Sequence, residues 1–107
     1  MISEEDVERA VHRRFQQEES LARAKAEHGR LVAFTKVLKA QLMQKHLELP
    51  LAGQEREAYA DPEYAEHLEI IAEAEERVLK LQYNRDDDGL LADVWRTQSS
   101  NARAVRL

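Results

Sequence analysis

The sequence predicts an all-α fold, a long antiparallel helical hairpin of the coiled-coil type, and three observations support this. Helix-forming residues, chiefly Ala, Leu, Glu, Gln, Lys and Arg, dominate both halves of the 107-residue chain. Apolar residues recur at spacings of three and four, which place them along one side of a helix. Both prolines and one of the three glycines lie in a single central stretch, where we expect the chain to turn.

The first helix is predicted over about residues 3–48. Ser3 and Asp6 are suited to cap its start, because a hydroxyl and a carboxylate can accept the free backbone N–H groups of a first turn. An inner row with heptad-like spacing follows, in which the two polar members are expected to fix the register: Leu21, Ala24, His28, Leu31, Thr35, Leu38 and Leu42. A less regular row, Val7, Val11 and Phe15, precedes it.

A turn is predicted over about residues 49–61, with a short helix over residues 54–59 as an option within it. Asp61 and Pro62 then cap and start a second helix, predicted over about residues 62–98. Its inner row is Tyr64, His67, Ile71, Ala74, Val78, Leu81, Arg85, Asp88, Ala92 and Trp95. The C-terminal tail is expected to fray, and residues 1–107 form one helical-hairpin domain.

The hairpin is expected to complete a four-helix bundle by dimerisation. With 35% charged and 6% aromatic residues, one chain has little material for a core. The segment around Phe34 is apolar on more than one side, which indicates burial on two sides. A monomeric hairpin with one wide apolar face is the alternative, and the sequence leaves open whether helices are exchanged between chains. The predicted self-association residues are Leu31, Phe34, Val37, Leu38, Leu42, Ile71 and Val78.

Composition narrows the functional classes. A net charge of −5 argues against a general coat for nucleic acids or membrane surfaces. The chain has no cysteine, which rules out disulfides and thiolate chemistry. An acidic start and the lack of any long apolar run favour a soluble, cytoplasmic protein without a signal peptide or membrane partner.

The stretch QYNRDDDGLL contains Asn84-x-Asp86-x-Asp88-Gly89, which is similar to the first half of an EF-hand calcium loop. Trp95 stands where that loop needs its bidentate glutamate, so a calcium site is not expected. We favour a helix that continues through residues 86–89 over a local break capped by Asp88, because a glycine costs a helix only about 1 kcal/mol.

No catalytic residue, cofactor or metal site is predicted. None of the four histidines follows a glutamate by three positions, as in the Glu-x-x-His motif of di-iron bundles. The chain also contains neither a Gly-x-Ser-x-Gly elbow nor a glycine-rich phosphate loop. The protein is therefore not expected to be an enzyme.

Basic residues are expected at the end of the hairpin where the chain termini meet. The candidate nucleic-acid contacts are Arg13, Arg14, Trp95, Arg96 and Arg103. Acidic neighbours such as Glu4, Glu5 and Glu18 dilute the positive field, so pairing within the protein is favoured over nucleic acid as a partner.

The ending WRTQSSNAR, residues 95–103, resembles that of small helical phage and prophage proteins of unknown function. Glu63-Tyr64 matches the start of their last helix, and the resemblance covers roughly residues 58–103. It implies an accessory role in phage DNA metabolism, in the bacterial host cytoplasm, and brings no catalytic residue. The function expected is a non-enzymatic adaptor that self-associates and binds an unidentified protein partner. The alternative is a nucleic-acid-binding accessory of phage replication or recombination.

Overall fold

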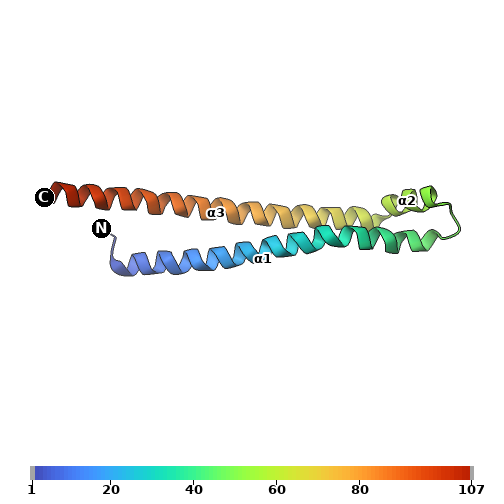
Figure 1. Cartoon of the computed structure of the whole chain (residues 1–107), viewed down its shortest axis with the longest axis horizontal. Coiled ribbons are helices and arrows are strands. Elements are labelled where there is room, and N and C mark those ends of the chain that lie inside the picture. The colour runs from blue at the N-terminus through green and yellow to red at the C-terminus, as the bar shows by residue number, and fades with distance from the viewer. Residues whose placement is uncertain (1, 107) are drawn as a thin grey trace. The chain divides into compact units, whose positions relative to one another are not determined.

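Helices make up all the regular structure of the described chain. The structure is a computed structural model that describes the backbone of residues 2–106 and the side chains of residues 2–102. In chain order the elements are α1 (Glu4–Met43), a short 3-10 helix η1 (Gln44–His46), α2 (Leu51–Ala60) and α3 (Pro62–Arg106) (Figure 1). No strand occurs within residues 2–106, so the predicted all-α class is confirmed.

The start of α1 carries the predicted cap. The Ser3 backbone N–H donates to Asp6 Oδ2 (3.1 Å), and the Asp6 N–H donates to Ser3 Oγ (3.2 Å). These reciprocal bonds occupy two backbone donors near the start of the helix, where the first turn has no carbonyl partners. The bond from the Ser3 backbone is the main reason that the pKa of Asp6 lies below its ordinary value.

Most of the predicted turn is helical. We expected a turn over about residues 49–61 with a short helix over residues 54–59 as an option, and the structure has such a helix, α2, over the longer range Leu51–Ala60. The first helix, α1, ends at Met43 and not near residue 48. At the start of α2 the Gln54 backbone N–H donates to the Pro50 carbonyl, and its side-chain Nε2 donates to the Leu49 carbonyl, both at 2.9 Å. The side-chain bond ties α2 to the residues that precede it, and a contact of this kind gives no signal in the spacing of apolar residues.

The start of α3 is the predicted Asp61-Pro62 pair. Asp61 Oδ1 accepts the Glu63 backbone N–H at 2.9 Å, and Pro62 is the first helical residue. That bond is the main cause of the lowered pKa of Asp61, and the charge of Lys45, whose Nζ lies 3.4 Å from Asp61 Oδ2, lowers it further. The restart of the helix is therefore confirmed at the residue level.

α3 is longer than predicted. The helix was expected to end near residue 98 with a frayed tail, but it continues to Arg106. No proline or glycine follows Gly89, so nothing in the covalent structure stops the helix there. The helix also runs unbroken through Asp86–Gly89, which confirms continuity over the alternative of a local break.

The chain divides into two compact units, each containing a segment of α1 and a segment of α3. We name residues 23–78 the central unit, and residues 2–22 together with residues 79–106 the terminal unit. In the central unit the buried core is formed by Leu38, Leu42 and Ala58, with Met43 and Tyr64 packed against it. α2 thus contributes its Ala58 to the core of this unit.

In the terminal unit polar side chains join α1 to α3. Gln17 Nε2 donates to Asp88 Oδ2 (2.5 Å), and Arg85 Nε lies 3.7 Å from Glu18 Oε1. Arg85 and Asp88 belong to the predicted inner row of the second helix, and both are half-buried. Leu21 is the buried apolar residue of the described part of this unit.

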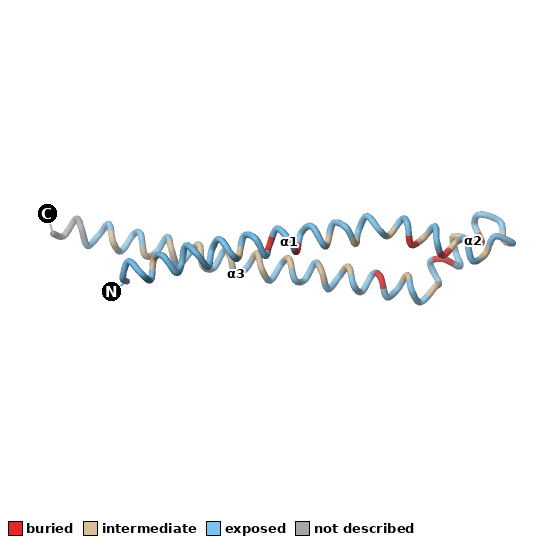
Figure 2. Tube along the Cα trace, turned by 90° about the horizontal axis from the view of Figure 1, so that it is seen from below, coloured by how far each residue is buried: buried red, intermediate tan, exposed pale blue. Residues whose placement is uncertain are grey.

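The predicted inner rows coincide with the less exposed positions of each helix (Figure 2). Every predicted row member from Leu21 to Leu42 in α1, and from Tyr64 to Trp95 in α3, is buried or half-buried. The earlier row was wrong at two positions, since Val11 is 65% and Phe15 is 70% exposed. If the three-and-four spacing of the inner row is continued back from Leu21, the next member is Gln17, which is half-buried, and not Phe15.

Candidate functional site

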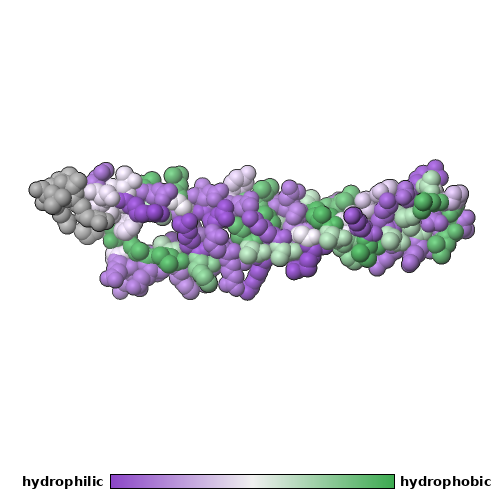
Figure 3. Space-filling view, viewed as in Figure 1, coloured by the Kyte–Doolittle hydropathy of each residue, from purple (hydrophilic) through white to green (hydrophobic). Residues whose placement is uncertain are grey.

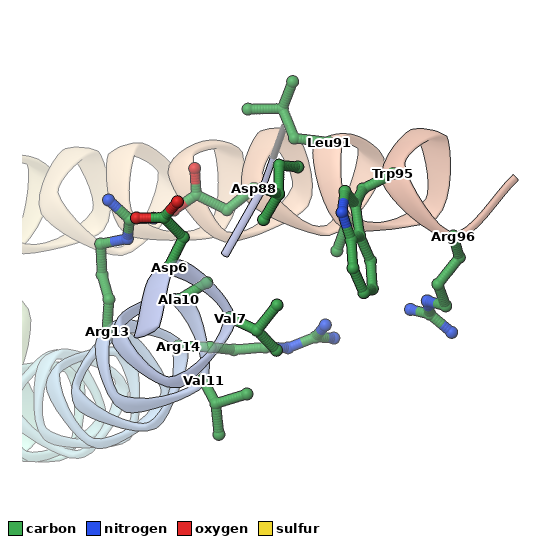
Figure 4. Close-up of a pocket in the computed structure, with 12 residues that line it drawn as sticks. Asp6, Val7, Ala10, Val11, Arg13, Arg14, Asp88, Leu91, Trp95 and Arg96 are labelled. Carbon is green, nitrogen blue, oxygen red and sulfur yellow. The ribbon is translucent and has the colours of Figure 1, made fainter. Parts of the chain in front are cut away.

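The terminal unit contains a pocket of about 500 Å³ between its segments of α1 and α3. Figure 4 shows Val7, Val11 and Arg14 projecting from α1, and Trp95 and Arg96 extending from α3, around this space. The lining residues are Ile2, Asp6, Val7, Ala10, Val11, Arg13 and Arg14 before or within α1, and Asp88, Leu91, Ala92, Trp95 and Arg96 within α3. The volume is within the range of about 300–1,000 Å³ that is usual for small-molecule sites.

Two small side chains, Ala10 and Ala92, line the pocket. Ala92 is a half-buried member of the inner row of α3, where a larger apolar side chain would fill part of the space, whereas Ala10 is exposed. Val7 in α1 and Trp95 in the inner row of α3 are both half-buried. Val7, Ala10, Ala92 and Trp95 supply an apolar part of the lining, which we call the floor of the pocket.

The charged lining residues are unequally partnered. The two acids already accept hydrogen bonds, Asp6 from Ser3 in the helix cap and Asp88 from Gln17. Arg96 Nη2 lies 2.9 Å from Asp93 Oδ1, in an exposed pair within one turn of α3. Arg13 and Arg14 form no hydrogen bond or ion pair with any of the residues described.

The structure brings together four of the five predicted nucleic-acid contacts. Arg13, Arg14, Trp95 and Arg96 all line the pocket. The fifth, Arg103, lies outside the described residues, because side chains are described only to residue 102. Pairing within the protein, which was favoured for these arginines, is present for Arg96 but not for Arg13 or Arg14 in the described part of the chain.

The apolar half of the pocket was not predicted as a site. Val11 was assigned to an inner row, and Leu91 was not singled out, although both line the pocket. The signal that could have located it is Ala92, because a small residue at an inner position of a helix leaves space beside it. Using that signal requires knowing which residues of α1 lie opposite Ala92, and the predicted inner rows do not give this.

The predicted self-association residues lie in the central unit, in two groups. Those of the inner rows are buried (Leu38, Leu42) or half-buried (Leu31, Ile71, Val78) within the packing of one chain. The other two, Phe34 and Val37, are 43% and 47% exposed. Only this second group offers an apolar surface that one chain leaves open.

His67 is the polar member of the central unit's interior. It is 7% exposed, and its Nε2 lies 3.0 Å from both Thr35 Oγ1 and the Leu31 carbonyl oxygen. The Phe34 ring packs edge-on against the imidazole, with centroids 5.8 Å apart. His28 was expected to be a polar residue of the inner row of α1, and it is half-buried there. The buried polar contact with Thr35 is made by His67.

Among the described residues, no three histidine or acidic side chains are grouped so that they could hold a metal ion. Asn84, Asp86 and Asp88, which resembled half a calcium loop, all lie within the regular helix α3. None of the helices, as far as they are described, has a stretch long and apolar enough to cross a membrane.

Comparison of the sequence with protein-family models and curated proteins, and of the structure with solved structures, finds no match.

Proposed function

We propose that the protein is a non-enzymatic helical adaptor that acts through self-association and contacts with another protein. In this proposal α1 and α3 pair as an antiparallel hairpin, and two hairpins complete a four-helix bundle. The resemblance of residues 95–103 to phage proteins motivates a role as an accessory of phage DNA metabolism in the bacterial cytoplasm.

The antiparallel pairing is supported within each unit by itself. In the central unit Lys45 lies beside Asp61, while the earlier residue Thr35 bonds to the later residue His67. In the terminal unit Gln17 bonds to Asp88, and Glu18, the next residue of α1, lies 3.7 Å from the earlier residue Arg85. Within each unit, moving back along α1 corresponds to moving forward along α3, which is the order of an antiparallel pair.

The observation that carries self-association is an apolar flank that the central unit leaves exposed. Phe34, Val37 and Ile70 are 43%, 47% and 41% exposed. Each stands one position before a member of an inner row, so in an antiparallel pair all three belong to one flank, which we call the Phe34 flank. Val32 and Leu68 each follow an inner-row residue and belong to the opposite flank.

The modest core makes burial of this flank favourable. Among the described side chains, five apolar residues are buried, and two of these are alanines: Leu21, Ala24, Leu38, Leu42 and Ala58. Apolar side chains lie among hydrophilic ones across the visible surface in Figure 3. Burying an exposed Phe or Val fully contributes about 1.5–3 kcal/mol, so covering two copies of the flank would contribute several. A second copy of the chain carries the same flank, so a homodimer would bury both flanks against each other.

The test is the mass of the protein in solution with the Phe34 flank altered. We expect Phe34→Glu/Val37→Glu to weaken dimerisation by at least about 100-fold, since two buried charges per chain would each lose hydration. Val32→Glu, at a similarly exposed position of the opposite flank, is the matched control and should leave the dimer intact. Size-exclusion chromatography with light scattering measures both.

A monodisperse, folded double variant with the same mass as the wild type would contradict the proposed interface. Equal disruption by Val32→Glu would also contradict it, because the effect would then not depend on the flank. Far-UV circular dichroism of each variant shows whether the helices are retained, and thus separates loss of association from loss of folding.

Nucleic-acid binding is the second candidate, because Arg13, Arg14, Trp95 and Arg96 line one pocket. Arginine contacts to phosphate would make binding strongly salt-dependent. A gel shift with single-stranded oligonucleotide at low salt, lost in Arg13→Ala/Arg14→Ala, is the expected result if this function holds. No shift, or an equal shift by the variant, would exclude it.

A further inference from the structure

We propose that the pocket of the terminal unit binds an organic anion with an apolar body, of the chemical class of a medium-chain fatty acid. This inference is independent of the dimer proposed above, because that proposal depends on the central unit. It also makes a different use of Arg13 and Arg14 from nucleic-acid binding, since the ligand's apolar part is essential.

The apolar floor of the pocket favours a ligand with an apolar body. It is formed by Val7, Ala10, Ala92 and Trp95, and Leu91 and Val11 stand exposed at its edges. An aliphatic chain lying there would cover these edges and fill the space beside the two alanines. A strongly hydrated phosphate chain would gain nothing from this surface, because apolar walls offer it no hydrogen bonds.

The charged side chains that line the pocket, which we call its rim, favour a ligand with a negative charge. Three guanidinium groups line the pocket against two carboxylates, and both carboxylates already accept hydrogen bonds from Ser3 or Gln17. Arg13 and Arg14 both line the pocket, and Figure 4 shows their side chains extending from α1 in different directions. A guanidinium group binds a carboxylate through paired N–H donors, so each of the two arginines offers a contact for an anionic head at its own part of the rim.

Trp95 makes the site directly observable. It is the single tryptophan of the chain, so emission excited at wavelengths that tyrosine does not absorb reports on this pocket. The probe is sodium decanoate at neutral pH, kept below the concentration at which it forms micelles. We expect a saturable shift of Trp95 emission, and little or no shift with decanol or decyltrimethylammonium, which share the chain but not the negative charge.

Three variants test the residues. Arg13→Ala/Arg14→Ala should weaken decanoate binding by about tenfold or more, because charge-assisted hydrogen bonds are lost. Arg30→Ala/Lys36→Ala removes the same charge from exposed positions of α1 outside the pocket and should bind like the wild type. Ala92→Leu should fill the pocket and abolish the saturable shift while the far-UV circular dichroism stays helical.

Several results would overturn the inference. These are the lack of a saturable shift with decanoate, an equal affinity in Arg13→Ala/Arg14→Ala, or an equal response to decanol. Vesicles of anionic phospholipid are tested as a second ligand, because a lipid surface also combines negative charge with apolar chains. A shift of Trp95 emission with decanoate supports binding of a free amphiphile, whereas a shift with vesicles and none with decanoate would overturn the inference. An oligonucleotide that shifts Trp95 when decanoate does not would assign the pocket to nucleic acid instead.

Discussion

Replacing Gly89 with alanine should stabilise the protein. Gly89 lies inside α3, no described glycine has a positive φ, and a Cβ added at Gly89 meets no atom within 4 Å. Alanine therefore keeps the native backbone and removes the conformational freedom that glycine gives the unfolded chain. Gly29 lies inside α1, and a Cβ added there likewise meets no atom within 4 Å.

The size of the effect follows from helix propensity. Alanine is favoured over glycine in a helix interior by about 0.8–1 kcal/mol, so each substitution should raise the free energy of unfolding by about that amount. The two sites share no neighbour that a new methyl group would touch, so the double variant should gain about 2 kcal/mol. For a chain of this size each kcal/mol corresponds to roughly 4–8 °C in Tm.

Gly53 supplies the matched control. It is buried in α2, and an added Cβ would lie 3.2 Å from Leu49 Cβ, closer than ordinary van der Waals contact. Gly53→Ala has the same propensity gain but must displace Leu49, so we expect it to gain less than the other two or to lose stability.

The assay is thermal and urea unfolding followed by far-UV circular dichroism at one fixed protein concentration, because dimerisation makes Tm depend on concentration. A marked loss of stability in Gly89→Ala would refute the continuous helix through Asp86–Gly89. An equal gain at all three glycines would show that space around the residue does not decide the outcome.

Three further predictions concern polar contacts. Thr35→Val removes one of the two groups bonded to His67 Nε2 and should lower the free energy of unfolding by about 1 kcal/mol, measured by urea titration. The folded-state pKa of Asp61 is lowered, so the ionised carboxylate stabilises the fold above the ordinary value of 3.8. This contribution to stability is lost as the pH falls through the folded-state pKa. Asp61→Asn should therefore reduce the fall of Tm with acidification, measured as Tm against pH. Gln17→Leu/Asp88→Leu replaces a half-buried polar pair whose Gln17 Oε1 has no partner among the described residues, and should raise stability by about 1–2 kcal/mol in the same titration, whereas Gln17→Leu alone should not.

Much of the helical framework was predictable because its signals are local. The Ser3 cap, the Asp61-Pro62 restart and the rows beginning at Leu21 and Tyr64 each follow from residue types at short spacings. The predicted row was wrong between Val7 and Leu21, because Val11 and Phe15 are exposed and Gln17 is half-buried. A polar residue at an inner position is recognisable only once its partner, Asp88, is placed on the other helix.

The candidate site was predictable in its charges but not in its shape. The expectation that the termini meet placed Arg13, Arg14, Trp95 and Arg96 together, since an antiparallel pair returns the end of the chain to its start. The pocket is lined in part by Ala10 and Ala92, which carry no chemical signal and are strong helix formers. The interface prediction mixed inner residues such as Leu38 with exposed ones such as Phe34, because both recur in one apolar segment and the spacing alone does not separate the sides.

Sedimentation equilibrium of the unmodified protein over a range of micromolar concentrations tests the central claim most directly. Self-association through the Phe34 flank predicts a molar mass of twice the chain mass, or a concentration-dependent approach to it. A single species with the mass of one chain at every concentration would contradict the proposed bundle.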